Sequence, residues 1–454
     1  MTVIYGRTYA QPIREAPTNS AGAPRRLALA VRALSRAGGA VRRTDHMKAD
    51  VVVIGAGALG LSTALHCALL GRSVIVVERD TAGSQASGRA AGLFKSVQAD
   101  ELRTRLARRS IEKAASFGDW AGTPLPVARC GSFLVARTGQ HQALIRAEAG
   151  QSRTWGADVR EAAAADLADR VSYYRGSGAD LAVWCPEDIY VEEPMSLVRA
   201  YLAACQSRGV EVLESEAVLS LPVSGGRVAG VETTARSITA GLAVVDAAGA
   251  WVRQVAELAG PGARVAVAPV RHQLLITEPS AELDPAEPIT RVVDAAIYLR
   301  PARGGLMFGG FETGPLPVDP RAEPASFRTG DLPLDLDVLR KLAAQVAVEA
   351  PLASAGRVAE HRGGLFTMSP DGRFVVGPVP DAPGLWVASG CNGSGFSSSP
   401  AIGEALASWI TGSEPAGLNA LSPGRFPLLT DEALISQGSW QYAHYYDPVL
   451  ADQR

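Results

Sequence analysis

A single β-α-β pattern near the start of the chain limits its possible folds more than any other feature. The β-branched run from Val51 to Ile54 leads directly into the turn from Gly55 to Gly60. Apolar residues then recur at helical spacing from Ala58 to Leu70, and a second apolar run from Ser73 to Val77 ends at Glu78. Such wholly apolar runs are typical of strands buried on both faces of a parallel sheet. The sequence therefore predicts a strand, a helix and a second strand joined by a right-handed connection.

The turn carries the glycine spacing of a dinucleotide-binding fingerprint. Gly55 permits the tight turn, Gly57 lets backbone amides approach a pyrophosphate, and Gly60 lets the helix pack closely on the sheet. The helix N-terminus adds partial positive charge, and Glu78 lies where a carboxylate accepts hydrogen bonds from the adenosine ribose. We predict that the ADP half of a cofactor binds here, and this half is common to NAD and FAD. The residues predicted to bind it are Gly55, Ala56, Gly57, Ala58, Leu59, Gly60, Glu78 and Arg79.

Composition and charge exclude several classes of partner. The chain has 454 residues, 47% of them hydrophobic, which exceeds the usual size of one domain. A formal charge of −2 offers no general attraction to nucleic acid or to an anionic membrane surface. Five scattered cysteines without a CxxC pair indicate neither a disulfide framework nor a metal site. Because the chain has no uninterrupted apolar run of about 18 residues, we expect no integral membrane segment. The scattered cysteines favour a reducing, cytoplasmic location.

Patterns further along the chain predict a second sheet and then a return to the first. A helix is expected from Pro194 to Gly209, followed by short strands. Alternating runs between Pro269 and Phe311 predict a separate sheet, and the proline-rich stretch from Pro315 to Pro333 predicts a long surface connection. An apolar strand from Leu385 to Ala388 then meets a small-residue loop and a helix expected from about Pro400 to Ile410.

The loops after these strands resemble those of one protein family. The stretch from Gly83 to Leu93 resembles the second flavin-contacting loop of the D-amino acid oxidase superfamily of FAD-dependent amine oxidoreductases. The segments 244–251, 269–278, 298–311 and 365–377, the last leading to 390–395, extend the resemblance over most of residues 50–412. The YLRP and GGF elements within 298–311 are most similar to the flavin domain of dimethylglycine and sarcosine dehydrogenases, and the chain is also similar to sarcosine and glycine oxidases. The resemblance implies FAD as the cofactor.

The same resemblance implies an α/β fold with a Rossmann-like FAD-binding domain and a second, α+β substrate domain built on an antiparallel sheet. We expect a discontinuous FAD-binding domain (47–130, 193–265 and 356–425) and a substrate domain (131–192 and 266–355). The arginine-rich residues 1–46 are interpreted as an N-terminal extension. The aromatic C-terminal tail, residues 426–454, is expected to dock on the body, to form an oligomer interface or to cover the pocket as a lid.

Beyond the turn, the resemblance implies a further set of cofactor-binding residues spread along the chain. They are Ser87, Arg89, Ala90, Ala91, Gly92, Leu93, Val218, Ala248, Gly249, Gly390, Gly393, Ser394, Gly395 and Phe396. Backbone amides of the loop from Gly393 to Phe396, which opens a helix, are expected to face the flavin edge on which charge develops during reduction. The alternative for this loop is a plain glycine and serine turn.

Departures from the family pattern bear on the cofactor link and on the electron acceptor. Arg89 stands where dimethylglycine dehydrogenase places a flavin-linked histidine, and Gly364 stands where monomeric sarcosine oxidases place a flavin-linked cysteine. We therefore expect non-covalent FAD. Met307 falls where sarcosine oxidases carry the lysine that activates dioxygen. A dehydrogenase is accordingly favoured over an oxidase, with oxygen, a quinone or an electron-transfer protein as the acceptor.

Another departure concerns recognition of the substrate. Phe366 stands where glycine oxidase and D-amino acid oxidase carry the arginine that clamps the substrate carboxylate by a bidentate pair. If the substrate is an amino acid, then Arg300, Lys95 or Arg271 has to bind its carboxylate from another direction. Otherwise the substrate lacks a carboxylate.

Three side chains are the candidates for a role in the chemistry. Tyr298 aligns with a substrate-pocket tyrosine of glycine oxidase, and simple packing is the alternative. Because a free imidazole titrates near neutrality, His272 is a candidate to deprotonate a substrate ammonium, and a structural hydrogen bond is the alternative. Arg300 follows on the face of Tyr298 if the strand is regular, and a solvated surface charge is the alternative.

The expected activity is oxidation of the C–N bond of a small secondary or N-methylated amine or amino acid. Hydride passes to flavin N5, and the imine product is then hydrolysed. One alternative is a flavin-binding subunit of a larger electron-transfer or substrate-channelling complex, and another is a D-amino acid dehydrogenase or oxidase. An NAD-dependent dehydrogenase is disfavoured because the residues after Glu78 match flavin loops. A homo-oligomer is possible from the sequence.

Overall fold

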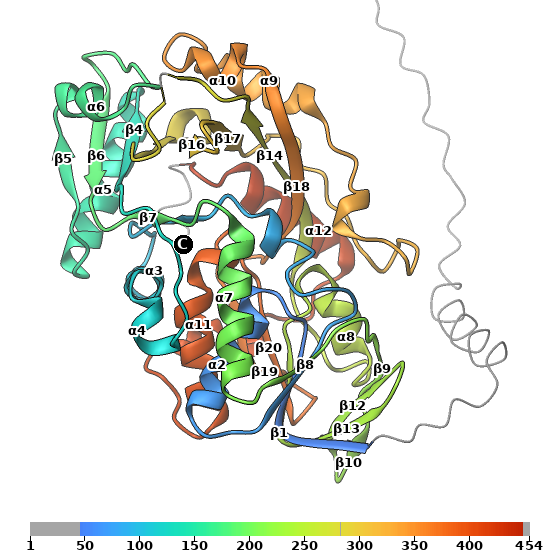
Figure 1. The fold of residues 1–454 in the computed structure, drawn as a ribbon. Coiled ribbons are helices and arrows are strands. Elements are labelled where there is room, and N and C mark those ends of the chain that lie inside the picture. The colour runs from blue at the N-terminus through green and yellow to red at the C-terminus, as the bar shows by residue number, and fades with distance from the viewer. Residues whose placement is uncertain (1–45, 282, 448–454) are drawn as a thin grey trace, which may run out of the picture. The chain divides into compact units, whose positions relative to one another are not determined.

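The computed structural model describes residues 46–281 and 283–447. The interpreted N-terminal extension, apart from His46, and residues 448–454 of the tail lie outside the described residues. Within the described ranges, every helix is too short or too polar to cross a lipid bilayer. The described chain contains two large sheets, and each is covered by helices (Figure 1).

The first sheet is parallel at its centre, as the β-α-β pattern predicts. Its strands follow the order β19-β20-β13-β1-β2-β8, in which β13 pairs in parallel with both β1 and β20, and β2 pairs in parallel with both β1 and β8. The bounds are β1 (His46–Ile54), β2 (Val74–Val77), β8 (Glu211–Leu213), β13 (Ser237–Asp246), β19 (Val375–Pro378) and β20 (Leu385–Ser389). The short strands β9 (Val218–Ser220) and β12 (Gly230–Thr233) extend it from β13.

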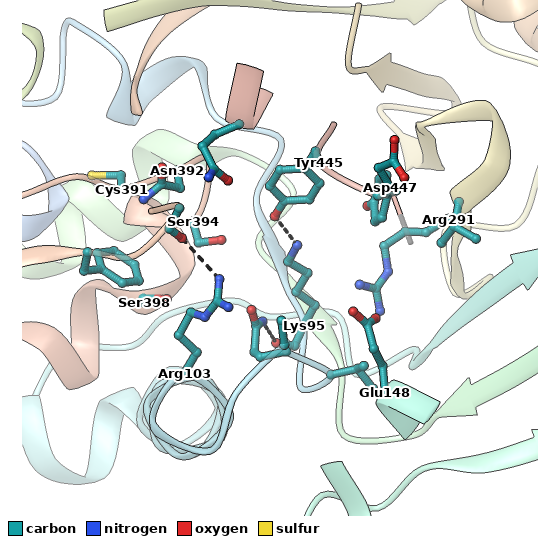
Figure 2. A pocket seen from close by; sticks show the side chains of 18 of the residues that line it. Lys95, Arg103, Glu148, Arg291, Cys391, Asn392, Ser394, Ser398, Tyr445 and Asp447 are labelled. Carbon is teal, nitrogen blue, oxygen red and sulfur yellow. Dashed lines mark hydrogen bonds between the residues drawn. The ribbon is translucent and has the colours of Figure 1, made fainter. Parts of the chain in front are cut away.

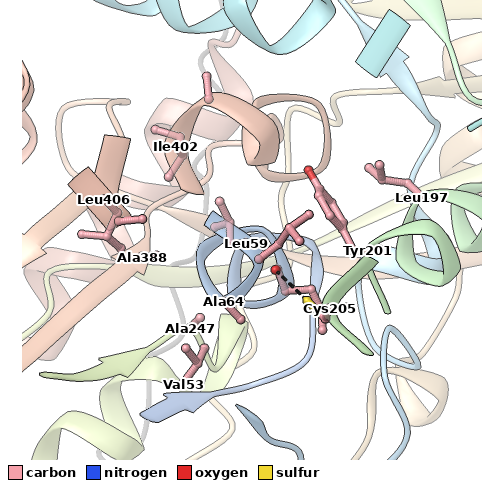
Figure 3. Close-up of a cluster of buried hydrophobic side chains, with 14 of the residues drawn as sticks. Val53, Leu59, Ala64, Leu197, Tyr201, Cys205, Ala247, Ala388, Ile402 and Leu406 are labelled. Atoms are coloured by element: carbon pink, nitrogen blue, oxygen red, sulfur yellow. Dashed lines mark hydrogen bonds between the residues drawn. The ribbon is translucent and has the colours of Figure 1, made fainter. Parts of the chain in front are cut away.

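Alternate side chains of β1 enter two different cores. Val51 and Val53 pack with the helices α2 (Ala58–Leu69), α7 (Pro194–Ser207) and α11 (Gly395–Ile410), as Figure 3 shows around Val53. Val52 and Ile54 pack on the opposite face, where α8 (Val252–Glu257) lies. Each such side chain contributes roughly 1.5–3 kcal/mol on complete burial. Burial on both faces explains why the run is continuously apolar.

The helix α11 begins at Gly395, five residues before the expected start at Pro400. Proline inside a helix lacks the N–H that would bond the carbonyl four residues earlier, and this loss normally ends a helix. Here the Ser399 hydroxyl donates to the Phe396 carbonyl oxygen at 2.8 Å, so the acceptor left by Pro400 is satisfied. The helix was predicted correctly, but its first residue was not. The bond from the Ser399 hydroxyl replaces the backbone bond that Pro400 cannot donate, so the helix extends to residues before the proline.

The second sheet follows the order β18-β14-β17-β16-β15-β4-β6-β5 and is antiparallel except for the pair β15 and β4. Its strands are β4 (Ser132–Ala136), β5 (Arg160–Ala162), β6 (Leu181–Cys185), β14 (Ala268–Thr277), β15 (Ile289–Val292), β16 (Ile297–Ala302), β17 (Gly305–Gly310) and β18 (Val358–Met368). Residues 358–368 therefore lie in the second sheet, although we expected the whole of 356–425 in the FAD-binding domain. Pairing of β18 with β14 along nearly its full length explains the difference.

The remaining elements connect and cover these sheets. The helices are α3 (Glu101–Ala115), α4 (Phe117–Ala121), α5 (Gly139–Thr154), α6 (Ala164–Arg170), α9 (Leu336–Ala344), α10 (Pro351–Ala355) and α12 (Asp431–Ala443). Two small ribbons pair β3 (Leu93–Phe94) with β7 (Ile189–Tyr190) and β10 (Val223–Ser224) with β11 (Arg227–Val228). Helix α12 of the expected aromatic tail packs on β14 and β18, so this part of the tail docks on the body.

Close approach of α2 and α11 gives a test of the fold. A Cβ atom on Gly403 of α11 would lie 2.3 Å from the Ser62 hydroxyl oxygen and 2.6 Å from the Ser62 carbonyl carbon on α2. Gly403→Ala therefore destabilises the protein by about 1–3 kcal/mol through overpacking, despite alanine's higher helix propensity. The measurement is the midpoint of urea unfolding.

The matched control lies inside α5. A Cβ on Gly150 would meet no atom closer than 3.9 Å, so Gly150→Ala is expected to raise stability by up to about 1 kcal/mol. Equal shifts in the two variants would contradict the close helix contact.

Candidate active site

Four loops meet at one edge of the first sheet because they follow parallel strands. Gly55 follows β1, Glu78 follows β2, Ala247 follows β13 and Gly390 follows β20. Carboxyl ends of parallel strands lie at the same edge, and the chain order reverses between β1 and β13. Open α/β sheets bind ligands in the crevice at such a switch point. The strand order thus brings together loops that are far apart in the sequence.

The predicted fingerprint turn is tightly braced. Gly55 has φ +103°, and a Cβ there would lie 2.6 Å from the Ala247 carbonyl oxygen. The Glu78 carboxylate accepts hydrogen bonds from the backbone N–H groups of Ala56 at 2.8 Å and Asp80 at 2.9 Å. Burial raises the pKa of Glu78. The Ser87 hydroxyl oxygen accepts the Ala58 N–H at 3.0 Å, so the second predicted cofactor loop lies directly against the turn.

The donor groups around this crevice fit FAD. Helices α2 and α11 both begin here, and neither has a side-chain cap or an acidic residue in its first turn. The Ala58 N–H at the start of α2 is already accepted by Ser87, so it is the remaining first-turn N–H groups of the two helices that suit the phosphates and the polar edge of a flavin. The buried Nε atom of Arg89, in the second predicted loop, makes no hydrogen bond within the described part of the chain. These residues provide positive charge and free donors where the cofactor is predicted.

Arg300 braces the second loop from the other sheet. Its guanidinium donates to the carbonyl oxygens of Ala91 (3.0 Å), Pro301 (2.7 Å) and Glu192 (3.1 Å) and lies over the Tyr190 ring at 4.3 Å. The side chain is fully buried, so the alternative of a solvated surface charge is wrong. Burial lowers the pKa of Arg300 to about 10. Its donors are committed to backbone that positions the predicted flavin loop.

Arg271 and Lys95 differ in how their charges are satisfied. Arg271 is buried, forms a salt bridge to Glu312 at 3.2 Å and donates to the Pro333 carbonyl oxygen at 2.5 Å. Lys95 donates to the Tyr445 hydroxyl and forms no salt bridge to an acidic residue among the described residues. Lys95 lines the cavity drawn in Figure 2, whereas Arg271 and Arg300 are not part of the lining of that cavity.

The cavity beside Lys95 joins several distant segments of the chain. Asn392 and Ser394 of the predicted flavin loop line it from one side, and Arg103 of α3 and Arg291 of β15 line it from others. Tyr445, immediately after α12, lines it as well, and Figure 2 shows its hydroxyl directed at the Lys95 amine. A polar, partly cationic cavity therefore lies next to the loop that opens α11.

His272 and Tyr298 belong to one buried hydrogen-bonded chain. His272 Nδ1 lies 2.8 Å from the Tyr442 hydroxyl, and Nε2 lies 2.9 Å from the Tyr298 hydroxyl. The two residues come from β14 and β16, and Gly309 on β17 between them lacks a side chain; a Cβ there would lie 2.2 Å from the Tyr298 hydroxyl oxygen. Burial lowers the pKa of His272 to about 3, so the imidazole is uncharged at neutral pH.

Comparison with known proteins identifies the family. The sequence profile described as FAD dependent oxidoreductase matches residues 50–409. The chain belongs to this family. Membership confirms the resemblance drawn from the loops and agrees with donors that fit FAD at the edge of the first sheet.

Several relatives are named for the oxidation of amines or amino acids, and one, of Mus musculus, is named as a pyruvate dehydrogenase phosphatase regulatory subunit (23% identical over 81% of this chain and 42% of its own length). A 4-methylaminobutanoate oxidase (formaldehyde-forming) of Paenarthrobacter nicotinovorans is 30% identical over 80% of this chain, which spans only 44% of that relative. A glycine oxidase of Pseudomonas aeruginosa is 30% identical over 81% of this chain and 96% of its own length. An L-proline dehydrogenase structure from P. horikoshii superposes with a TM-score of 0.75 at 22% identity, covering 84% of this chain and 98% of that one. The last match shows a shared fold.

Two positions at which this chain departs from the family pattern are apolar in the structure. Phe366 on β18 stacks on His272 with ring centroids 4.2 Å apart. Met307 on β17 is fully buried among Leu274, Ile276 and Ala302. Neither position presents a charged group to the predicted flavin.

Other predicted cofactor residues occupy the same edge or its surroundings. Ala90 and Gly92 belong to the loop that Arg300 and Arg362 contact, and Leu93 pairs with Tyr190. Ala248 donates its N–H to Asp246 at 3.1 Å, Gly249 opens a short 3-10 helix, and Val218 is partly buried on β9. Gly393, Gly395 and Phe396 lie at the start of α11, and Arg79 lies over the Trp251 ring at 4.5 Å. Their contact with FAD remains a prediction.

The tail tyrosines were not among the residues predicted for the site. Tyr442 and Tyr445 lie more than 140 positions from Tyr298 in the chain, and only the cluster of aromatics in a chain with 6% aromatic residues marked this tail. In the structure Tyr442 hydrogen-bonds His272 and Tyr445 lines the cavity. This part of the tail therefore both docks on the body and forms part of the cavity wall. Local pattern does not reveal such contacts.

Burial of histidine predicts a pH dependence of stability. Burial lowers the pKa of both His66 and His272 from 6.5 to about 3. Below pH 6.5 the unfolded chain takes up protons there that the folded chain does not, so the free energy of unfolding falls as pH decreases towards about 3. His272→Gln is expected to reduce this slope by up to about 1.4 kcal/mol per pH unit between pH 6 and pH 4.

Urea unfolding of the FAD-loaded protein at several pH values measures that slope. An unchanged slope in His272→Gln would contradict an uncharged, buried imidazole.

Proposed function

We propose that this chain uses non-covalently bound FAD to oxidise the C–N bond of a small secondary or N-methylated amino acid, giving an imine that water hydrolyses. The bound flavin supplies the hydride acceptor at N5. Arg89 and Gly364, at the two positions aligned with covalent anchors, offer no nucleophile for a flavin link. The family relationship supports flavin-dependent amine oxidation, and the relatives' names supply the class of substrate.

The observation that carries this proposal is the position of Lys95. Its ammonium lines the cavity next to the predicted flavin loop, and within the described residues no acidic side chain forms a salt bridge with it. Arg300 and Arg271, by contrast, are committed to backbone carbonyls and to Glu312. A cation held in a partly enclosed site without an anionic partner favours an anionic ligand. A substrate carboxylate is such a ligand, and 4-methylaminobutanoate and glycine, named for two relatives, each carry one.

His272 and Tyr298 would orient the substrate amine. Because burial keeps His272 uncharged, it adds no repulsion to an approaching ammonium group. The same low pKa makes His272 a weak base, so an orienting role is favoured over proton abstraction from the ammonium. The hydrogen bonds at both ring nitrogens fix the plane of the imidazole and the direction of the Tyr298 hydroxyl. Positioning of this kind brings the reacting C–H bond into line.

A dehydrogenase is favoured over an oxidase. The site that carries the oxygen-activating lysine in sarcosine oxidases holds Met307, which is buried in an apolar cluster and supplies no charge. Superoxide formed from dioxygen would lack that electrostatic stabilisation. A quinone or an electron-transfer protein is the expected acceptor.

One experiment orders the alternatives. The purified protein is loaded with FAD, and its visible spectrum is followed without oxygen during addition of sarcosine, dimethylglycine, proline, 4-methylaminobutanoate, glycine and D-alanine. Bleaching by the secondary and tertiary amines supports the proposal, whereas bleaching by D-alanine alone favours a D-amino acid dehydrogenase. A colourless protein refutes flavin binding. FAD that stays attached to the protein after denaturation in acid refutes non-covalent binding. A yellow protein bleached by no amine favours a flavin subunit of a larger complex.

Readmission of air to the reduced protein tests the acceptor. Slow reoxidation without much peroxide, together with rapid reoxidation by a soluble quinone, is expected for a dehydrogenase. Fast peroxide formation would contradict the argument from Met307.

Lys95 is tested by removing its charge. Lys95→Met lowers kcat/KM for the amino acid that bleaches the flavin by about 10–100-fold, because a charged hydrogen bond contributes roughly 1.5–3 kcal/mol. Oxidation of the matching amine without a carboxylate is expected to change little. The control is Lys341→Met, which changes an exposed lysine of α9 and is expected to leave kcat/KM for both substrates unchanged. Equal loss for both substrates would contradict a carboxylate site at Lys95.

A further inference from the structure

The C-terminal segment, residues 431–447, is fixed to the body at several points. Thr430 caps α12 by accepting the Ala433 N–H at 3.2 Å, and Asp431 forms salt bridges with Arg253 and Arg321. Gln441 donates to the Pro370 carbonyl oxygen at 2.9 Å. Thr430 and Asp431 do not line the cavity, whereas Gln441 lines it through a side chain other than that of Tyr445. The segment is therefore held in place independently of the side chains that it directs towards Lys95.

Tyr445 is held in the cavity wall by its ring and contacts Lys95 through its hydroxyl, and the Lys95 amine also lies 4.6 Å from the centre of its ring. Its ring stacks on Phe311 with centroids 4.0 Å apart and an interplanar angle of 8°. Its hydroxyl contacts the Lys95 amine (Figure 2). The ring stack docks the residue, and the hydroxyl is not needed for that purpose. The hydroxyl contact with a lysine that lacks an acidic partner calls for another explanation.

The chemistry of the two groups matches a carboxylate. A lysine ammonium has three donors, and one of them goes to the Tyr445 oxygen. The phenol oxygen accepts that bond and keeps its own O–H as a donor. A cationic N–H and a neutral O–H side by side can each donate to one oxygen of a carboxylate, as the two arms of an arginine do. Phe366 supplies no such group at the position aligned with the family's arginine.

We propose that Tyr445 is a specificity-determining residue that, together with Lys95, clamps the substrate carboxylate and so selects amino acids over simple amines. This inference rests on the proposed function, because it assigns the second half of the same carboxylate site. Arg103 and Arg291 line the cavity as cations, and Glu148 and Asp447 line it as acids. Arg103 already pairs with Asp100 at 2.7 Å, and Arg291 pairs with Asp188 at 3.3 Å. Arg103 Nη2 and Arg291 Nε have no hydrogen-bond partner among the described residues, but both guanidinium charges are paired. Lys95 is the lining cation that pairs with no acidic side chain among the described residues, and Tyr445 is the neutral donor beside it.

Binding of acetate to the FAD-loaded protein tests the clamp without turnover. Acetate has a carboxylate and no amine to oxidise, and its binding is followed by the change in flavin absorbance. Tyr445→Phe keeps the stack on Phe311 and removes only the hydroxyl, so the Kd of acetate is expected to rise about 10–100-fold, the loss of one hydrogen bond to a charged group. The ratio of kcat/KM for the amino acid to that for the amine without a carboxylate is expected to fall by a similar factor.

Two further variants separate the possible outcomes. Tyr173→Phe removes another buried tyrosine hydroxyl, which donates to the Pro288 carbonyl oxygen at 2.5 Å. Because Tyr173 does not line the cavity, this variant is expected to leave acetate binding unchanged. In the Lys95→Met variant, Tyr445→Phe is expected to raise the Kd of acetate by a much smaller factor than it does in the parent protein, because the clamp needs both groups.

Each result decides between the two proposals. If Lys95→Met weakens acetate binding and Tyr445→Phe does not, the carboxylate site stands and the role of Tyr445 is refuted. A tighter Kd in Tyr445→Phe also refutes the clamp, since the phenol would then compete with the ligand for Lys95. If neither variant changes acetate binding or the ratio of kcat/KM, the carboxylate site itself fails while flavin-dependent amine oxidation is still measured by the bleaching experiment.

Discussion

The parallel pairing of β13 with both β1 and β20 is the constraint on which the rest of the structure depends. It places the fingerprint turn after β1 and the loop after β20 at one edge, although more than 300 residues separate them in sequence. Helices α2 and α11 then start side by side, and their spacing is set where Gly403 of α11 meets Ser62 of α2. Two helix N-termini directed to one crevice provide the positive potential that a dinucleotide requires.

The distribution of buried charge explains how the second sheet serves this crevice. Arg300 donates hydrogen bonds to carbonyl oxygens, including that of Ala91 in the predicted flavin loop, and Arg271 forms a salt bridge with Glu312. Such groups are stable in a dry interior because each has partners, and they gain nothing from a ligand. The Lys95 ammonium contacts the Tyr445 phenol and pairs with no carboxylate among the described residues, so an anionic ligand would stabilise its charge. The lysine without an acidic partner among the described residues therefore lies where we propose that the substrate carboxylate binds.

Sequence reasoning located the features that local pattern encodes. The β-α-β unit from Val51 to Glu78, the loop from Gly390 to Gly395 and the family were all predicted, because strand runs, glycine spacing and loop motifs are short-range signals. The start of α11 was misplaced because a Ser399 side-chain bond offsets Pro400. The assignment of β18 and the burial of Arg300 depend on strand pairing across long separations. Tyr445 could not be assigned from sequence, because its partner Lys95 lies 350 positions away.

The phenylalanine at position 366 and the docked tail are physically coupled. Phe366 stacks on His272, and the rings of Phe311, Tyr442 and Tyr445 continue the same cluster. An arginine at 366 would place a charge against rings that hold His272 uncharged, and an unpaired buried charge costs several kcal/mol. The cluster therefore tolerates the tail only while position 366 is apolar. An apolar residue at position 366 lets the tail pack, and the packed tail brings the Tyr445 hydroxyl to Lys95, where we propose that the substrate carboxylate binds.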